Sequence, residues 1–62
     1  MDYNDYEILT PEDVMDYLYI GRNAVYTLLN SGKLKAFRVG RNWKIPKMAL
    51  DDYIASESGM KL

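Results

Sequence analysis

The sequence predicts a mainly α-helical fold with one small β-hairpin. Apolar residues recur at helical spacing in three segments, and the spacing changes to simple alternation between the second and third of them. The chain has 62 residues, enough for one domain that buries about 60% of the surface its extended form exposes. Apolar residues make up 48% and charged residues 27%, as in globular rather than disordered chains. We therefore expect a single domain with a small core.

The first helix is expected to begin at Pro11. Thr10 can cap it, Pro11 suits the first helical position, and Asp13 stands where a capping box has Glu or Gln. Leu9 and Val14 are then spaced for a hydrophobic staple. The residues predicted to share the apolar face are Val14, Tyr17 and Leu18.

A second helix is expected from about Arg22 to Asn30, after an interruption at residues 19–21. Ser31 and Gly32 stop it, and Gly32 can take the left-handed C-terminal conformation. Its apolar face holds Val25, Leu28 and Leu29. Its opposite face is polar without being acidic and holds Asn23, Tyr26, Thr27 and Asn30. Two short helices joined by a turn of three or four residues have the layout of a helix-turn-helix.

Residues 36–45 are expected to form the hairpin, with a turn at residues 40–42. The predicted apolar face holds Phe37, Val39, Trp43 and Ile45. The predicted opposite face holds Arg38 and Lys44. Pro46 ends the strand and can open a last helix, where Leu50, Tyr53 and Ile54 return to helical spacing. This organisation predicts an acidic N-terminal segment at 1–8, a folded domain at 9–55 and a flexible tail at 56–62.

Charge is strongly sorted along the chain, although the net charge is only −1. Residues 1–16 carry six acids and no base, whereas residues 17–50 carry seven bases and no acid. A partner responds to the charge within a Debye length of about 8–10 Å, so the middle of the chain can bind a polyanion. The alternative is a solvated basic face with no ligand.

Several classes of protein are excluded by what the sequence lacks. It has no cysteine and no histidine, which excludes disulfide frameworks, thiolate zinc sites and the usual nucleophile and base pairs of enzymes. We expect no enzyme activity and no cofactor. No apolar run approaches the ~20 residues of a membrane span, so no membrane partner is expected. The acidic, polar N-terminus is unlike a signal peptide, which predicts a cytoplasmic location.

Six short stretches occur in an order and spacing known from one family. They are Leu9-Thr10-x-Glu12-Asp13-Val14, Arg22-x-x-Val25-Tyr26-x-Leu28-Leu29, Ser31-Gly32-x-Leu34, Ala36-Phe37-Arg38-Val39-Gly40, Trp43-Lys44-Ile45-Pro46 and Leu50-Asp51. From Leu9 to Ile54 the chain resembles the small winged helix-turn-helix DNA-binding domains of excisionase type, which are related to the DNA-binding heads of MerR regulators. It departs from their pattern at Tyr19, where they usually have glycine, and at Gly21, where they usually have a serine cap. Tyr19 can therefore require a positive φ, unusual for a bulky residue.

The resemblance implies double-stranded DNA as the partner. The second helix would enter the major groove, and the hairpin, as a wing, would lie at the backbone or in the minor groove. The residues expected at DNA are Arg22, Asn23, Tyr26, Thr27, Asn30, Lys33, Lys35, Arg38, Arg41, Asn42 and Lys44. Arg22 can form a fork to guanine or phosphate, Asn23 can match adenine, and the Tyr26 and Thr27 hydroxyls can donate to phosphate or their apolar parts can contact a thymine methyl.

Other interpretations of these residues stay open. Tyr26 can instead pack partly against the hairpin, and Arg22 can form an ion pair with Asp16 or Asp13. Trp43 is assigned to the core rather than to base stacking, because it alternates with Ile45.

The resemblance also implies a biological role. Excisionase-type proteins bind neighbouring sites cooperatively and bend DNA at recombination sites of a mobile element, so that an integrase can assemble there. The acidic segment 1–16 could face a basic edge of a second copy or an integrase; alternatively it only maintains solubility. A small transcriptional regulator would use the same fold. A protein-interaction module that no longer binds DNA is disfavoured by the polar outer face of the second helix.

Overall fold

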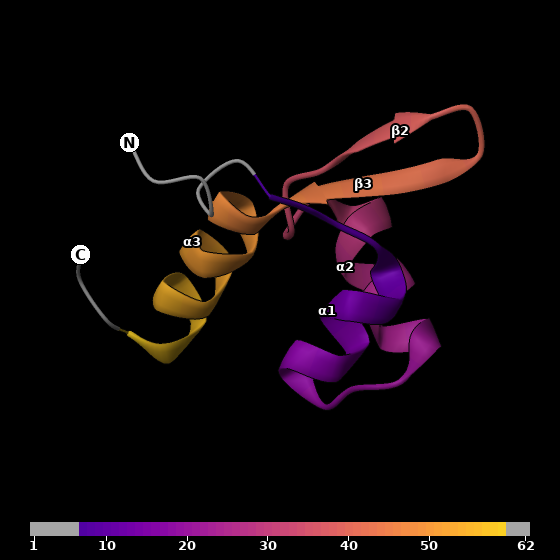
Figure 1. The fold of residues 1–62 in the computed structure, drawn as a ribbon. Coiled ribbons are helices and arrows are strands. Elements are labelled where there is room, and N and C mark those ends of the chain that lie inside the picture. The colour runs from indigo at the N-terminus through magenta and orange to yellow at the C-terminus, as the bar shows by residue number, and fades with distance from the viewer. Residues whose placement is uncertain (1–6, 60–62) are drawn as a thin grey trace.

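The fold follows the predicted order of helices and hairpin, with one additional strand. The computed structural model describes residues 7–59. Its elements are β1 (Ile8–Leu9), α1 (Pro11–Leu18), α2 (Arg22–Ser31), β2 (Phe37–Val39), β3 (Asn42–Pro46) and α3 (Lys47–Ser58). The strands form an antiparallel sheet in the order β1-β3-β2. The β2–β3 hairpin, which we call the wing, projects beyond α2, whereas α3 lies toward the other end of the sheet (Figure 1). The mainly helical fold with a small hairpin is confirmed.

The start of α1 confirms the predicted capping box. The Asp13 backbone N–H donates to Thr10 Oγ1 at 3.1 Å, and the Thr10 backbone N–H donates to Asp13 Oδ2 at 3.0 Å. Aspartate therefore closes the box where glutamate is more usual, and two backbone donors that the helix start leaves free are satisfied. The other end of α1 confirms the unusual backbone expected at Tyr19, which has φ 55° and ψ 45°. This left-handed residue turns the chain toward α2.

Glycines bound α2 at both ends. Gly21 is an extended N-cap with no side-chain hydrogen bond, and Gly32 ends the helix at φ 82° with its N–H donating to the Leu29 carbonyl. Residues 19–21 thus form the three-residue turn expected between the two helices. A positive φ costs glycine no Cβ clash, so Gly32 lets the chain leave α2 sharply toward the wing.

The chain ends of the domain differ from the prediction. Ile8 and Leu9 pair with Pro46 and Ile45, so the sheet begins inside the segment 1–8 that was predicted to precede the domain. At the other end, α3 continues through residues 56–58, which were predicted to belong to a flexible tail. Its last turn is closed by the Ser58 hydroxyl, which donates to the Ile54 carbonyl at 2.7 Å, and by Gly59 at φ 76°. The serine and glycine residues at positions 56–59 therefore mark the end of α3 and not a tail that follows it. Residues 1–6 and 60–62 lie outside the described part.

The predicted faces of the wing are wrong for β2. Val39 pairs with Asn42, Arg38 with Trp43 and Phe37 with Lys44, so only Gly40 and Arg41 form the turn. Paired residues project from the same side of a sheet. A turn shorter by one residue therefore places Arg38, not Phe37 or Val39, on the side of Trp43 and Ile45. Gly40 has φ 63°, as a two-residue hairpin with glycine in its first position requires.

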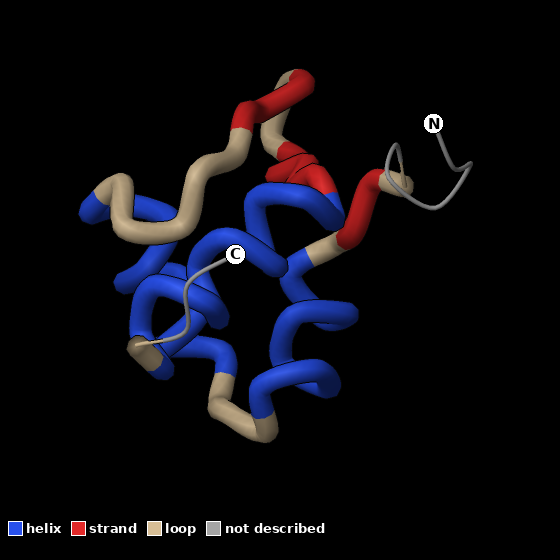
Figure 2. The backbone as a smooth tube through the Cα atoms, turned by 90° about the vertical axis from the view of Figure 1, so that its left-hand side faces the viewer, coloured by secondary structure: helices blue, strands red, loops and turns tan. Residues whose placement is uncertain are grey.

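The core lies between the three helices and the inner face of the sheet. It is one cluster of buried side chains: Leu9, Val14, Val25, Leu29, Leu34, Ile45 and Leu50. Trp43 is half-buried against this cluster, in agreement with its predicted structural role. Tyr17 was predicted on the apolar face of α1 but is 51% exposed, with the Lys47 ammonium 5.8 Å from its ring centroid. Figure 2 shows the strands gathered on one side of the helices.

Candidate nucleic-acid interface

The predicted polar face of α2 is open to solvent except at Tyr26. Asn23, Thr27 and Asn30 are exposed and Tyr26 is half-buried, while Val25 and Leu29 on the opposite face are buried. Arg22, the first residue of α2, is also exposed. The Thr27 hydroxyl donates to the Asn23 carbonyl at 2.9 Å, which uses its hydrogen within the helix. Thr27 therefore offers its methyl group and oxygen lone pairs, and contact with a thymine methyl suits it better than donation to phosphate.

Arg22 forms an ion pair, but not with the predicted acids. Its Nη1 lies 3.3 Å from Glu12 Oε2, and the two side chains are 59% and 58% exposed. Asp13 is occupied by the capping box, whereas Glu12, one residue earlier, is free to reach the first residue of α2. Glu12 was not among the residues predicted at this surface. No sequence pattern indicates it, because the contact spans ten positions across the turn.

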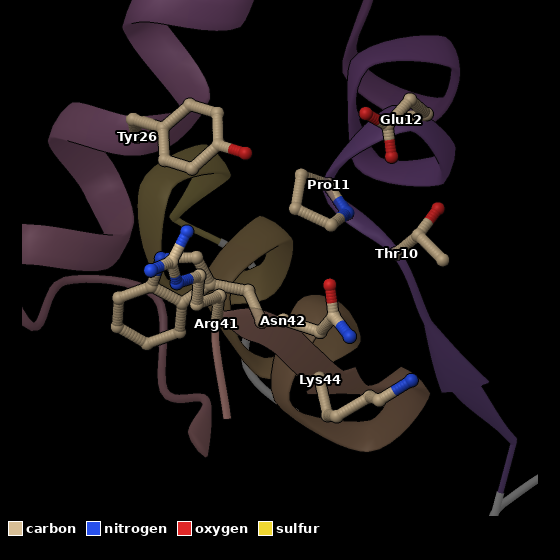
Figure 3. A pocket seen from close by; sticks show the side chains of 8 residues that line it. Thr10, Pro11, Glu12, Tyr26, Arg41, Asn42 and Lys44 are labelled. Carbon is tan, nitrogen blue, oxygen red and sulfur yellow. The ribbon is translucent and has the colours of Figure 1, made fainter. Parts of the chain in front are cut away.

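A hollow of about 230 Å³ lies where α1, α2 and the wing meet. Its lining residues are Thr10, Pro11, Glu12, Tyr26, Arg41, Asn42, Trp43 and Lys44. Figure 3 shows Tyr26 extending from α2 toward Pro11, with Arg41, Asn42 and Lys44 bordering the space from the wing. Four residues predicted at DNA, one from α2 and three from the wing, thus share one concavity. The charged residues of its lining are the cations Arg41 and Lys44 and the carboxylate Glu12.

Tyr26 combines two of the interpretations that the sequence left open. It is half-buried, and it packs against the core cluster, whereas the alternative interpretation placed it partly against the hairpin. It also lines the hollow beside the wing, where its hydroxyl points away from α2 (Figure 3). Tyrosine suits such a position because its ring can be buried while its hydroxyl reaches a polar ligand.

The remaining predicted cations do not line the hollow. Lys33 and Lys35 are exposed on the connection between α2 and β2. Arg38 is exposed on β2 and its guanidinium carbon lies 5.2 Å from the Trp43 ring centroid. This cation–π contact holds one wing cation on the same sheet face as the tryptophan. The seventh base of the basic segment, Lys47, belongs to α3 and pairs with Asp51 at 3.4 Å.

Comparison with known proteins agrees with this arrangement. A family model described as "Helix-turn-helix domain" matches residues 8–58, which is most of the chain. The chain belongs to this helix-turn-helix family. The domain is 42% identical over 48 residues to a probable excisionase of Saccharopolyspora erythraea, covering 77% of the present chain and 49% of that protein. It is 32% identical over 53 residues to an excisionase of Streptomyces ambofaciens, covering 86% of both chains.

The helix-turn-helix domain is therefore of the excisionase type that its motifs predicted. It spans about half the length of the Saccharopolyspora relative. No solved structure shows a significant similarity to it. Within residues 7–59, no helix has the length and apolar character needed to cross a bilayer.

Proposed function

We propose that this helix-turn-helix domain binds double-stranded DNA and bends it at the recombination sites of a mobile element. In this proposal α2 enters the major groove and the wing lies against the backbone or in the adjacent minor groove. The observation that carries it is the hollow, which Tyr26 of α2 shares with Arg41 and Lys44 of the wing. The role requires no catalytic step and no cofactor.

The shape of the hollow suits a sugar-phosphate backbone. One DNA strand separates the major groove from the minor groove. When the helix of a protein lies in one groove and its hairpin in the other, the backbone of that strand must lie between the helix and the hairpin. The hollow lies between α2 and the wing and has Arg41 and Lys44 on its wing side. Arginine and lysine supply the charge-assisted contacts that phosphates favour.

The similarity to two excisionases favours recombination over regulation of transcription as the role of this DNA binding. A transcriptional regulator would present the same residues to the duplex, because fold and contact chemistry do not distinguish the two roles.

Arg22 and Lys44 are expected to contribute in different ways. Arg22→Ala should cost about 1–3 kcal/mol of discrimination at one base pair, because a bidentate contact to a base edge is lost. Lys44→Ala should weaken binding to all sequences by a similar factor, because phosphates are the same in every sequence. A preferred duplex is first selected from a random pool, and each variant is then titrated against the preferred duplex and a scrambled duplex by fluorescence anisotropy. Equal loss on both duplexes for Arg22→Ala would contradict its assignment to a base.

Self-association on DNA and an integrase partner are finer parts of the proposal. The acids of α1, Glu12, Asp13 and Asp16, are exposed and lie earlier in the chain than the basic segment, so neighbouring copies can oppose unlike charges. We expect binding to two adjacent sites to be cooperative, and more strongly at low salt. Titration of duplexes carrying one or two sites measures this. Independent filling of the two sites at all salt concentrations would remove self-association from the proposal.

A further inference from the structure

The ion pair between Arg22 and Glu12 joins the starts of the two helices of the motif. Glu12 is the second residue of α1 and Arg22 the first of α2, and the atoms in contact are Nη1 and Oε2 at 3.3 Å. Both side chains are more than half exposed, so their contact adds little to the stability of the fold. The contact therefore matters for the direction in which Arg22 extends more than for the stability of the domain.

The contact leaves the part of Arg22 that can recognise a base. A guanidinium has five N–H donors in a rigid plane. With Nη1 directed at Glu12, the edge formed by Nε and Nη2 can still donate two parallel hydrogen bonds. Guanine presents two matching acceptors, O6 and N7, in the major groove. Glu12 can therefore hold the arginine plane while the arginine contacts guanine.

The position of Glu12 also affects phosphates. Its carboxylate lines the hollow that Arg41 and Lys44 border, and it is the acidic residue of that lining. A phosphate approaching Arg22 from the hollow meets this negative charge. A guanine edge carries acceptor atoms but no net charge, so it meets a much weaker repulsion.

We propose that Glu12 is a positioning residue that makes Arg22 selective for guanine over phosphate. The inference rests on the proposed DNA binding and adds to it a residue that sets specificity. With Glu12 in place, Arg22 contributes to affinity only where a guanine stands opposite it. Without the carboxylate, the freed guanidinium can bind a phosphate in any sequence.

The test compares Glu12→Gln with Asp16→Asn. Both substitutions remove one negative charge from an exposed position of α1, but only Glu12 lines the hollow. We expect Glu12→Gln to raise affinity for a scrambled duplex more than for the preferred duplex, so that the ratio of the two affinities falls about 3- to 10-fold, within the coupling usual for contacting residues. Asp16→Asn should raise both affinities alike. The thermal midpoints of both variants should stay close to that of the parent, since each substitution is at the surface.

The same measurement in an Arg22→Ala background shows whether Glu12 acts through Arg22. There, Glu12→Gln should leave the affinity ratio unchanged. The inference would be overturned if Glu12→Gln lowered the affinity ratio in the Arg22→Ala background as well, or if Asp16→Asn lowered the ratio as much as Glu12→Gln does. Either result would leave the proposed DNA binding intact. A parent domain that binds no duplex would instead overturn the proposed function itself, so the two failures are distinguishable.

Discussion

Ile45→Ala is expected to remove most of the stability of this domain. Ile45 is fully buried in the middle of the sheet, where it pairs with Leu9 and belongs to the cluster that also contains Val14 and Leu50. Truncating a buried isoleucine to alanine costs about 2–5 kcal/mol. A chain of this length has a total stability of about 3–9 kcal/mol. Urea unfolding followed by circular dichroism should show the midpoint falling to a small fraction of the parent value or the transition disappearing.

Val39→Ala is the matched control on the same hairpin. Val39 is 57% exposed, and surface substitutions of this kind change the free energy of unfolding by about 0.5 kcal/mol or less. The comparison also tests the observed register of the wing, because the pattern expected from sequence places both residues on one apolar face. Comparable losses for the two substitutions would show that Val39 packs inward and that the observed register is wrong.

DNA affinity is expected to fall about 250- to 1000-fold when salt rises from about 50 mM to 200 mM. This corresponds to a slope of about −4 to −5 in log affinity against log salt, as expected if about four to six cations neutralise phosphates. The basic segment supplies seven candidates, of which Lys47 already pairs with Asp51 on α3. Titrations of one duplex at several salt concentrations measure the slope. Affinity that does not change with salt would exclude a phosphate-bound interface.

Two variants assign the slope to particular residues. Arg41→Ala removes a cation that lines the hollow, and the slope should become shallower by about 1. Lys47→Ala removes the same charge from α3, where the ammonium lies 3.4 Å from Asp51 Oδ2 and 5.8 Å from the Tyr17 ring centroid, and the slope should not change. If Lys47→Ala changed the slope as much as Arg41→Ala, the cations would act through the net charge of the domain and not through a defined surface.

The helices could be predicted from sequence because their ends depend on local interactions. Thr10 and Asp13 are three residues apart and form the capping box by themselves, and Gly32 ends α2 through its own backbone freedom. The left-handed conformation of Tyr19 was expected for a different reason, because Tyr19 stands where the excisionase-type domains usually have glycine. The outward face of α2 followed from helical periodicity, since Val25 and Leu29 fix the buried side.

The features that sequence did not predict depend on contacts between distant residues or on a single position in a turn. Strand β1 forms only because Ile8 and Leu9 meet Pro46 and Ile45, far along the chain. The contact of Arg22 with Glu12 requires α1 and α2 to be packed. The faces of the wing depend on whether its turn has two or three residues, and Gly40-Arg41-Asn42 is compatible with both.

The tight turn at Gly40 and Arg41 has a consequence for comparing this domain with its relatives. Side chains alternate between the two sides of a strand, so one inserted residue reverses the side on which every following position emerges. Here the outer side of β2 displays Phe37 and Val39, which are 48% and 57% exposed, and the inner side holds Arg38 against Trp43. In a relative with an odd number of turn residues, the equivalent arginine would emerge outward and the apolar pair inward. Wing residues that align in sequence are therefore functionally equivalent only between relatives whose wing turns both have an even number of residues, or both an odd number.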